Sequence, residues 1–464
     1  MKQSLTAFAA TFGISLMVYA VLRQDCFYRH DGWGFFTAID QGLGFHADHP
    51  FYMPMARPWC ALLALVGIGT FAALGLFSAF GTAIAVAIHT LSLRRLGMKD
   101  PVLGTAWVGL CPAVLFFATV VEIHGVFLAF AAFCFYLTVV LVDRKSLPLA
   151  ALLGISLALT WQVHASGILL PLVYLPWYLR RAGWNGRVIG TAVVAGLLAF
   201  TILLLVREGS MGTTLGGAGN VLASLRDLGA ESHRIGEVLW VEWLWPFLPT
   251  SVLVVLLLFS GKWRVDAGLL LLTLVPYVLT GTLILQESSE LGAYFLPWIF
   301  PASILCLESL GPRLARVLVL AGALLGIVNI TSHERSRGVD PDWAARVVQT
   351  CGDRTCYVML WDDWEMDSLL LHADGRRIQA LFMRPYAMYA PDVQRLRLPA
   401  YGLWLSGREK LLVSARTREG LADREGSQSG PILFEWLENE QPHVLLDARG
   451  QRADHAPDPK DQHR

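Results

Sequence analysis

Residues 29–58 read RHDGWGFFTAIDQGLGFHADHPFYMPMARP, and this stretch follows the first long apolar run of the chain. It contains three aspartates, three histidines and two arginines among many aromatic side chains. Ionisable side chains are costly inside a bilayer, and at membrane depth they usually face a water-filled cavity. We therefore expect this stretch to lie at a membrane surface and to form one wall of a polar cleft.

Composition places the chain among integral membrane proteins, because 55% of its 464 residues are hydrophobic and only 16% are charged. Long apolar runs fill residues 1–331, whereas residues 332–464 are rich in Asp, Glu, Arg and Gly. The sequence therefore predicts a membrane domain followed by a soluble tail. A net charge of zero gives no basic excess that would favour nucleic acid as a partner.

Hydropathy predicts about eleven transmembrane helices, each close to the length that a hydrocarbon core of about 30 Å requires. The predicted spans are residues 4–22, 72–92, 101–120, 125–142, 147–162, 166–179, 188–206, 246–260, 266–285, 293–310 and 317–331. The first of them contains VYA at residues 18–20, which resembles a signal-peptidase site, but its apolar region is long for a signal peptide. We favour a retained membrane anchor.

Basic residues in the short connections indicate the orientation. They lie on one side of the predicted spans, at Lys2, Arg94, Arg95, Lys99, Arg144, Lys145, Arg180, Arg181, Arg187, Lys262, Arg264, Arg313 and Arg316. The opposite short connections, 121–124, 163–165 and 286–292, contain no Lys or Arg. The positive-inside rule then predicts a multi-pass protein of a bacterial inner membrane, with a cytoplasmic N-terminus and an extracytoplasmic tail.

Two long connections are predicted on the outer side, residues 23–58 and 207–245. In the tail, segments such as CYVMLW and HVLLDA have the composition of strands, so we expect a small α/β domain with a disordered end. Cys351 and Cys356 are close enough in sequence to form a disulfide in an oxidising compartment, an alternative that the sequence leaves open.

Polar side chains occur in the short outward connections between the predicted spans. They are Glu122 and His124 in VVEIHGV, Gln162 and His164 in TWQVHASG, and Glu287 and Glu290 in LQESSELGAYFLP. Each alone has an ordinary explanation as a solvated turn residue or a packing histidine. Because all three turns face the same side, we expect them to outline one cleft together with residues 29–58.

Imidazole and carboxylate groups suit zinc or manganese, so His49, Glu122, His124 and His164 are candidate ligands of a divalent metal. They come from separate connections, and their sequence spacing gives no support for a metal site. The cofactor is left open, with a divalent metal not favoured.

Several short motifs resemble the GT-C superfamily of membrane glycosyltransferases, most nearly its bacterial branch related to protein O-mannosyltransferases. They are the aspartate and aromatics after the first span, HADHPFYMP before the second, EIHG after the third, and VHASGILLPLVYLP and AYFLPWIFPASI later. The resemblance covers residues 1–331 and implies transfer of a sugar from a polyprenyl-phosphate donor at the extracytoplasmic face. It assigns the acidic residue of the first loop to Asp31 and a further acidic position to Glu122, whereas the second adjacent carboxylate of many members is missing in HDGW.

We therefore expect an inverting glycosyltransferase in which Asp31 is the general base, since burial raises the pKa of a carboxylate towards working pH. The remaining predicted site residues bind substrate: His49, Arg57, His124, His164, Glu290 and Tyr294. The expected acceptor is a glycan, a lipid or a protein. A membrane transporter or a non-catalytic scaffold is the alternative, and a transporter would be expected to have charged residues in mid-span.

Overall fold

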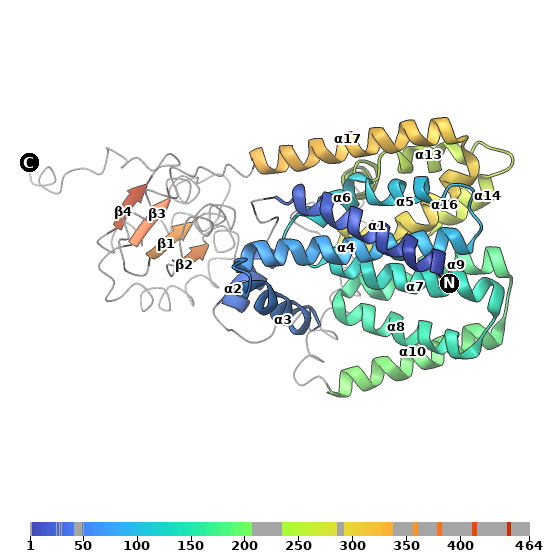
Figure 1. Ribbon diagram of the computed structural model, residues 1–464, viewed down its shortest axis with the longest axis horizontal. Coiled ribbons are helices and arrows are strands. Elements are labelled where there is room, and N and C mark those ends of the chain that lie inside the picture. Colours follow the sequence, from blue (N-terminus) through green and yellow to red (C-terminus); the bar gives the residue numbers. More distant parts are fainter. Residues whose placement is uncertain are drawn as a thin grey trace, which may run out of the picture. The chain divides into compact units, whose positions relative to one another are not determined.

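The computed structural model describes residues 2–24, 26, 28, 30–40, 49, 51–206, 234–284 and 292–336, and four strands between residues 356 and 446 (Figure 1). Contacts within the chain separate two compact units. The first is Met1–Gln24 with Gly34–Ser332, and the second is Asp25–Trp33 with His333–Arg464.

Helices make up almost all of the described residues between 2 and 336. They are α1 (Lys2–Val21), α2 (His30–Asp40), α3 (Tyr52–Ala64), α4 (Thr70–Arg95), α5 (Pro101–Gly109), α6 (Pro112–Thr119), α7 (His124–Arg144), α8 (Leu147–Val163), η1 (Ala165–Leu169), α9 (Leu170–Ala182), α10 (Gly186–Val206), α12 (Arg234–Val238), the π-helix η3 (Leu239–Leu244), α13 (Thr250–Leu257), α14 (Arg264–Leu272), α15 (Val275–Ile284), η4 (Ala293–Trp298), α16 (Ile299–Ser309) and α17 (Pro312–Ser336). The mostly helical membrane fold predicted from composition is therefore present.

Five of the described helices are long and apolar enough to cross a membrane: α1, α4, α7, α10 and α17. The predicted span 101–120 is a pair of helices, α5 and α6, bent by 62° at a short break. Other predicted spans are shorter pieces, because α13 has 8 residues and α14 has 9. At 1.5 Å per residue neither is long enough to cross alone, so the count of eleven spans is not confirmed.

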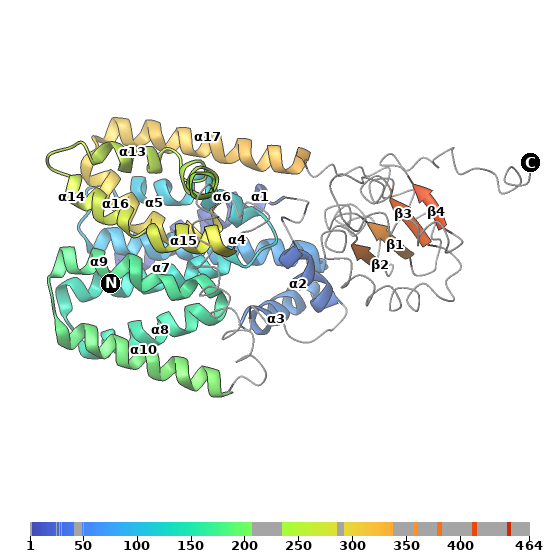
Figure 2. The same ribbon diagram turned by 180° about the vertical axis from the view of Figure 1, so that it is seen from behind.

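Glycines let the central helices approach closely. A Cβ on Gly81 of α4 would lie 2.7 Å from the carbonyl oxygen of Gly125 in α7. In the same way, a Cβ on Gly154 of α8 would collide with the carbonyl oxygen of Ala192 in α10. Small residues at such crossings are a common way to pack transmembrane helices. Figure 2 shows α4, α7, α8 and α10 as successive elongated rods within the first unit.

The two predicted outer loops differ from expectation where the structure describes them. Residues 23–58, expected as a loop, contain α2 and the beginning of α3. Gly32 and Gly34 lie within α2, although glycine disfavours helix on propensity scales. Of the second predicted loop, residues 234–244 are helical in α12 and η3, and residues 207–233 lie outside the described residues.

The described part of the tail is a four-stranded parallel sheet in the order β2-β1-β3-β4. Its strands are β1 (Cys356–Leu360), β2 (Ile378–Phe382), β3 (Leu411–Ser414) and β4 (His443–Leu446). The helices expected for a small α/β domain, the disordered end and Cys351 of the expected disulfide lie outside the described residues, so these stay predictions.

Candidate functional site

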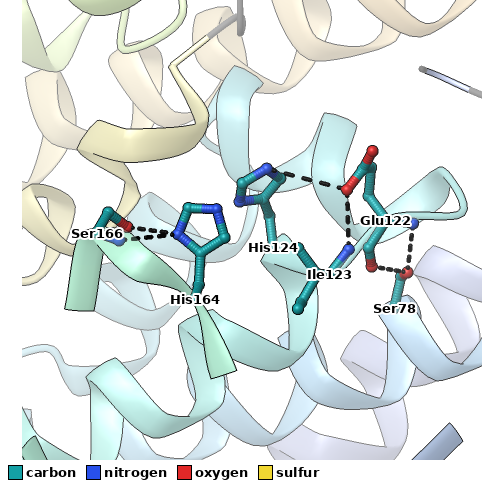
Figure 3. Close-up of polar contacts among 6 residues, drawn as sticks. All are labelled: Ser78, Glu122, Ile123, His124, His164 and Ser166. Atoms are coloured by element: carbon teal, nitrogen blue, oxygen red, sulfur yellow. Dashed lines mark hydrogen bonds and ion pairs between the residues drawn. The ribbon is translucent and has the colours of Figure 1, made fainter. Parts of the chain in front are cut away.

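The turn between α6 and α7 buries a carboxylate. Glu122 is only 3% exposed, and its turn is anchored to α4 by Ser78. The Ser78 hydroxyl donates to the carbonyl oxygen of Glu122 at 2.7 Å, and the Glu122 amide donates back to Ser78 Oγ at 3.2 Å (Figure 3). Oε2 of Glu122 accepts a hydrogen bond from the Ile123 amide at 3.0 Å. The backbone and the carboxylate of this turn are therefore fixed together.

Two buried imidazoles lie beside this carboxylate. His124, the first residue of α7, has Nε2 3.9 Å from Oε2 of Glu122. His164 follows the last residue of α8, and its ring centroid is 4.8 Å from that of His124. Figure 3 shows the two rings next to one another, between Ser166 and Glu122. Turns that are far apart in sequence thus meet in one cluster.

Ser166 determines the tautomer of His164. The Ser166 amide donates to Nδ1 of His164 at 3.2 Å, and the Ser166 hydroxyl lies 2.7 Å from the same atom. An atom that accepts from an amide carries no proton, so the neutral ring has its proton on Nε2. His164 lies in the turn after α8, and burial, followed by the charges of His124 and His49, lowers its pKa well below the usual value. The neutral form of His164 therefore predominates at physiological pH.

His49 and Tyr294 complete the cluster, and Tyr52 lies close to it. The rings of His49 and His164 are stacked, with centroids 5.3 Å apart and planes within 11°. Tyr294 of η4 lies 5.4 Å from His164 by ring centroids. Tyr52 at the start of α3 is fully buried, and burial, with a smaller effect of the Glu122 charge, raises its pKa well above the usual value. We call the group Glu122, His124, His164, His49 and Tyr294 the polar cluster.

The other predicted site residues are not part of the described cluster. Asp31 lies in the first turn of α2, in the segment that belongs to the second unit, and its side chain is outside the described residues. Arg57 is an exposed residue of α3. Glu290, like Glu287, lies outside the described residues. The roles of Asp31, Arg57 and Glu290 therefore stay predictions.

Sequence reasoning missed three polar residues at this end of the molecule. Ser78 lies in an apolar span, and nothing local in the sequence marks it as a partner of a turn 44 residues away. Ser166 is two residues from His164, a spacing at which a side chain can bond a neighbouring amide. Glu242 of η3 is 2% exposed, and its Oε2 accepts from the Gly292 amide at 2.9 Å, just before η4 and Tyr294. That contact positions the start of η4.

The polar cluster does not have the geometry of a metal site. Among the residues whose placement the structure describes, no three or more His, Cys, Asp or Glu side chains form a group that could hold a metal ion.

An apolar groove of about 370 Å³ lies between α7, α8, α9 and α10. Its lining extends from Leu141, Tyr178 and Val188 to Trp161 and Gly167. These last two residues flank the turn that holds His164, so one end of the groove adjoins the polar cluster. The lining is almost entirely apolar, as expected of a surface that faces hydrocarbon.

Comparisons with known proteins bear on the fold. No family model matches the chain, and no curated protein matches it in sequence. Two crystal structures of ArnT from Cupriavidus metallidurans match with a TM-score of 0.55 each. The apo structure is 14% identical over 90% of this chain and 95% of ArnT, and the structure bound to undecaprenyl phosphate is 12% identical over 89% and 94%.

The oligosaccharyltransferase of Archaeoglobus fulgidus, in a complex with zinc and sulfate, matches at 11% identity over 79% of this chain and 62% of its own. Its TM-score is 0.43. The agreement with ArnT covers nearly the whole of both chains and shows a shared fold. The predicted resemblance to GT-C membrane glycosyltransferases is thus confirmed at the level of the fold, whereas the branch related to protein O-mannosyltransferases stays a prediction.

Proposed function

We propose that this chain, which has the fold of ArnT, is a membrane glycosyltransferase that moves a sugar from a polyprenyl-phosphate donor to an extracytoplasmic acceptor. The observation that carries the proposal is the pairing of a buried polar cluster with an apolar groove that ends beside it. A lipid-linked sugar has both chemistries in one molecule, a hydrocarbon chain and a polar head group.

The groove supports a lipid donor. It lies among α7, α8, α9 and α10, and the spanning helix α10 is only 6% buried over its most apolar window. A hydrocarbon chain could therefore enter from the bilayer without crossing water. One of the two matching ArnT structures is bound to undecaprenyl phosphate, which is a polyprenyl phosphate, and this also favours a donor of that class.

Transfer requires one bond to form and one to break. The acceptor hydroxyl attacks C1 of the sugar, its proton passes to a base, and the bond from C1 to the phosphate oxygen breaks, so that polyprenyl phosphate leaves with the bonding electron pair. A single displacement of this kind inverts the configuration at C1. We assign the base to the carboxylate of Asp31 and contacts with the departing phosphate to Arg57 and His49, as the sequence predicts, because polar groups at the leaving group stabilise developing charge.

The polar cluster suits recognition of the sugar and stabilisation of charge. Glu122 Oε2 is held by the Ile123 amide, which leaves a carboxylate in a fixed orientation to accept hydrogen bonds from sugar hydroxyls. Neutral His164 is a donor at Nε2, since Nδ1 accepts from Ser166. Donors and acceptors held in a buried site need no reorganisation during the reaction, and such preorganisation is usually a large part of catalysis.

The test is transfer of labelled sugar from polyprenyl-phosphate donors by purified chains in which Asp31→Asn and Glu122→Gln are compared with the wild type. We expect Asp31→Asn to lower turnover by at least a hundredfold and Glu122→Gln by about tenfold. Asp40→Asn, at the other end of α2, is the matched control and should retain wild-type turnover. Near-normal turnover of Asp31→Asn at equal amounts of folded protein would refute the assignment of the base.

A further inference from the structure

An arginine near the polar cluster has no role in the reaction described so far. Arg23 follows α1, and its side chain is half-buried with Nη1 fully buried. An arginine at the end of a span usually extends its guanidinium along the shortest path to water. Here the side chain lies instead against α4, the helix whose Ser78 anchors the Glu122 turn.

Gly75 makes the room for this side chain. A Cβ at Gly75 would lie 2.9 Å from Cδ and 3.1 Å from Cγ of Arg23, and 3.9 Å from Cγ2 of Val121. Glycine inside a helix costs about 1 kcal/mol relative to alanine, so α4 gives up stability where the arginine crosses it. Val121 precedes Glu122, which places the aliphatic part of Arg23 next to the acidic turn.

Phe71 contacts the guanidinium of Arg23, and Gln24 fixes the backbone beside it. Cζ of Arg23 lies 5.6 Å from the centroid of the Phe71 ring, within the range of a cation–π contact. The adjacent Gln24 is fully buried. Its backbone amide donates to the carbonyl oxygen of Thr119 at 2.8 Å, and its side-chain Nε2 donates to Thr119 Oγ1 at 2.9 Å. The cation is therefore fixed against the N-terminal part of α4, close to the turn that carries Glu122.

We propose that Arg23 binds the phosphate of the lipid donor, a role that rests on the proposed function. A guanidinium presents paired N–H donors that match two phosphate oxygens, and a stacked, partly buried arginine is already oriented to use them. Gly75 makes room for the aliphatic stem of Arg23, and the Phe71 ring lies against its guanidinium. Arg23 lies against α4, the helix that also holds the Glu122 turn through Ser78, so phosphate and sugar would be held side by side.

The experiment measures binding of undecaprenyl phosphate, and of uncharged undecaprenol for comparison, to full-length protein in phosphatidylcholine nanodiscs. We expect Arg23→Gln to weaken binding of undecaprenyl phosphate at least tenfold and Arg23→Lys about threefold, with binding of undecaprenol unchanged in both. Gly75→Ala should weaken it severalfold, because the new methyl group displaces the arginine stem. Gly190→Ala is the matched control, since a Cβ at Gly190 of α10 meets nothing within 4 Å.

Two results would overturn the inference in different ways. If wild-type protein prefers undecaprenyl phosphate to undecaprenol but Arg23→Gln and Arg23→Lys bind it as the wild type does, Arg23 is not a phosphate ligand and the proposed function stands. If wild-type protein shows no such preference, the proposed function fails together with the inference. Arg94→Gln, an exposed arginine at the far end of α4, controls for the loss of one positive charge and should bind as the wild type does.

Discussion

Replacing Ser78 by alanine should destabilise the protein and slow transfer together. Ser78 is fully buried and forms two hydrogen bonds with the backbone of Glu122, one as donor at 2.7 Å and one as acceptor at 3.2 Å. Alanine leaves one buried carbonyl and one buried amide to find other partners, and each unsatisfied group costs about 1–3 kcal/mol. Allowing for relaxation of the turn, we expect the free energy of unfolding to fall by about 3 kcal/mol.

The same substitution frees the turn that orients the Glu122 carboxylate. A displacement of about 1 Å at a catalytic group can lower the rate about a hundredfold, so we expect transfer to slow by tenfold to a hundredfold. Ser92→Ala is the matched control, because Ser92 is also fully buried in α4 but its hydroxyl makes only a 3.4 Å contact with the Ile88 carbonyl of its own helix. Its cost should stay below about 1 kcal/mol.

Unfolding of both variants can be followed by denaturant titration in detergent, and turnover with a labelled lipid-linked sugar. If Ser78→Ala and Ser92→Ala lose equal stability, within about 0.5 kcal/mol, the two bonds to Glu122 do not hold the turn as argued. If Ser78→Ala loses stability but keeps wild-type turnover, the orientation of Glu122 does not matter for the reaction.

Three further predictions concern the surroundings of the polar cluster. Glu242→Ala removes the acceptor of the Gly292 amide and should lower turnover severalfold, whereas Glu242→Gln, which keeps an acceptor oxygen, should be close to wild type in the same assay. The pKa of His164 is lowered by burial below its usual 6.5, so the unfolded chain takes up the proton first as the pH falls. Stability should therefore be full above about pH 6.5 and should fall as the pH drops below it, and denaturant titrations should show a smaller pH dependence for His164→Gln. Ala158→Trp fills the groove and should raise KM for a long-chain donor about tenfold, whereas Ile155→Trp, an exposed position on the same helix, should leave KM unchanged.

The gathering of polar turns could be predicted from the sequence, because ionisable residues at the ends of apolar runs are costly in hydrocarbon and usually face a shared water-filled cavity. Glu122, His124 and His164 were singled out on that ground, and the structure brings them into one cluster with His49. Ser78 could not be found in this way, because a serine inside an apolar span is equally compatible with a bond to its own helix. Only the crossing of α4 and α7 makes it a partner of Glu122.

Breaks within the spans were also hard to predict. Residues 101–120 have the hydropathy of one span, but Pro112 lacks an amide hydrogen and disfavours helix at the residue before it, so α5 and α6 meet at a sharp bend. The pair CP at 111–112 was a local signal of that break. Residues 30–40 show the reverse, because they form the helix α2 within a stretch that the sequence predicts as an outer connection between apolar runs.

Recognition of a polyprenyl phosphate by this chain underlies both the proposed function and the role proposed for Arg23. Native mass spectrometry of the purified full-length protein, offered equal amounts of undecaprenyl phosphate and undecaprenol, tests it most directly. We expect one bound undecaprenyl phosphate per chain, retained in clear preference to undecaprenol and lost when Arg23 is replaced by glutamine. Equal retention of the two lipids by folded wild-type protein would contradict the claim.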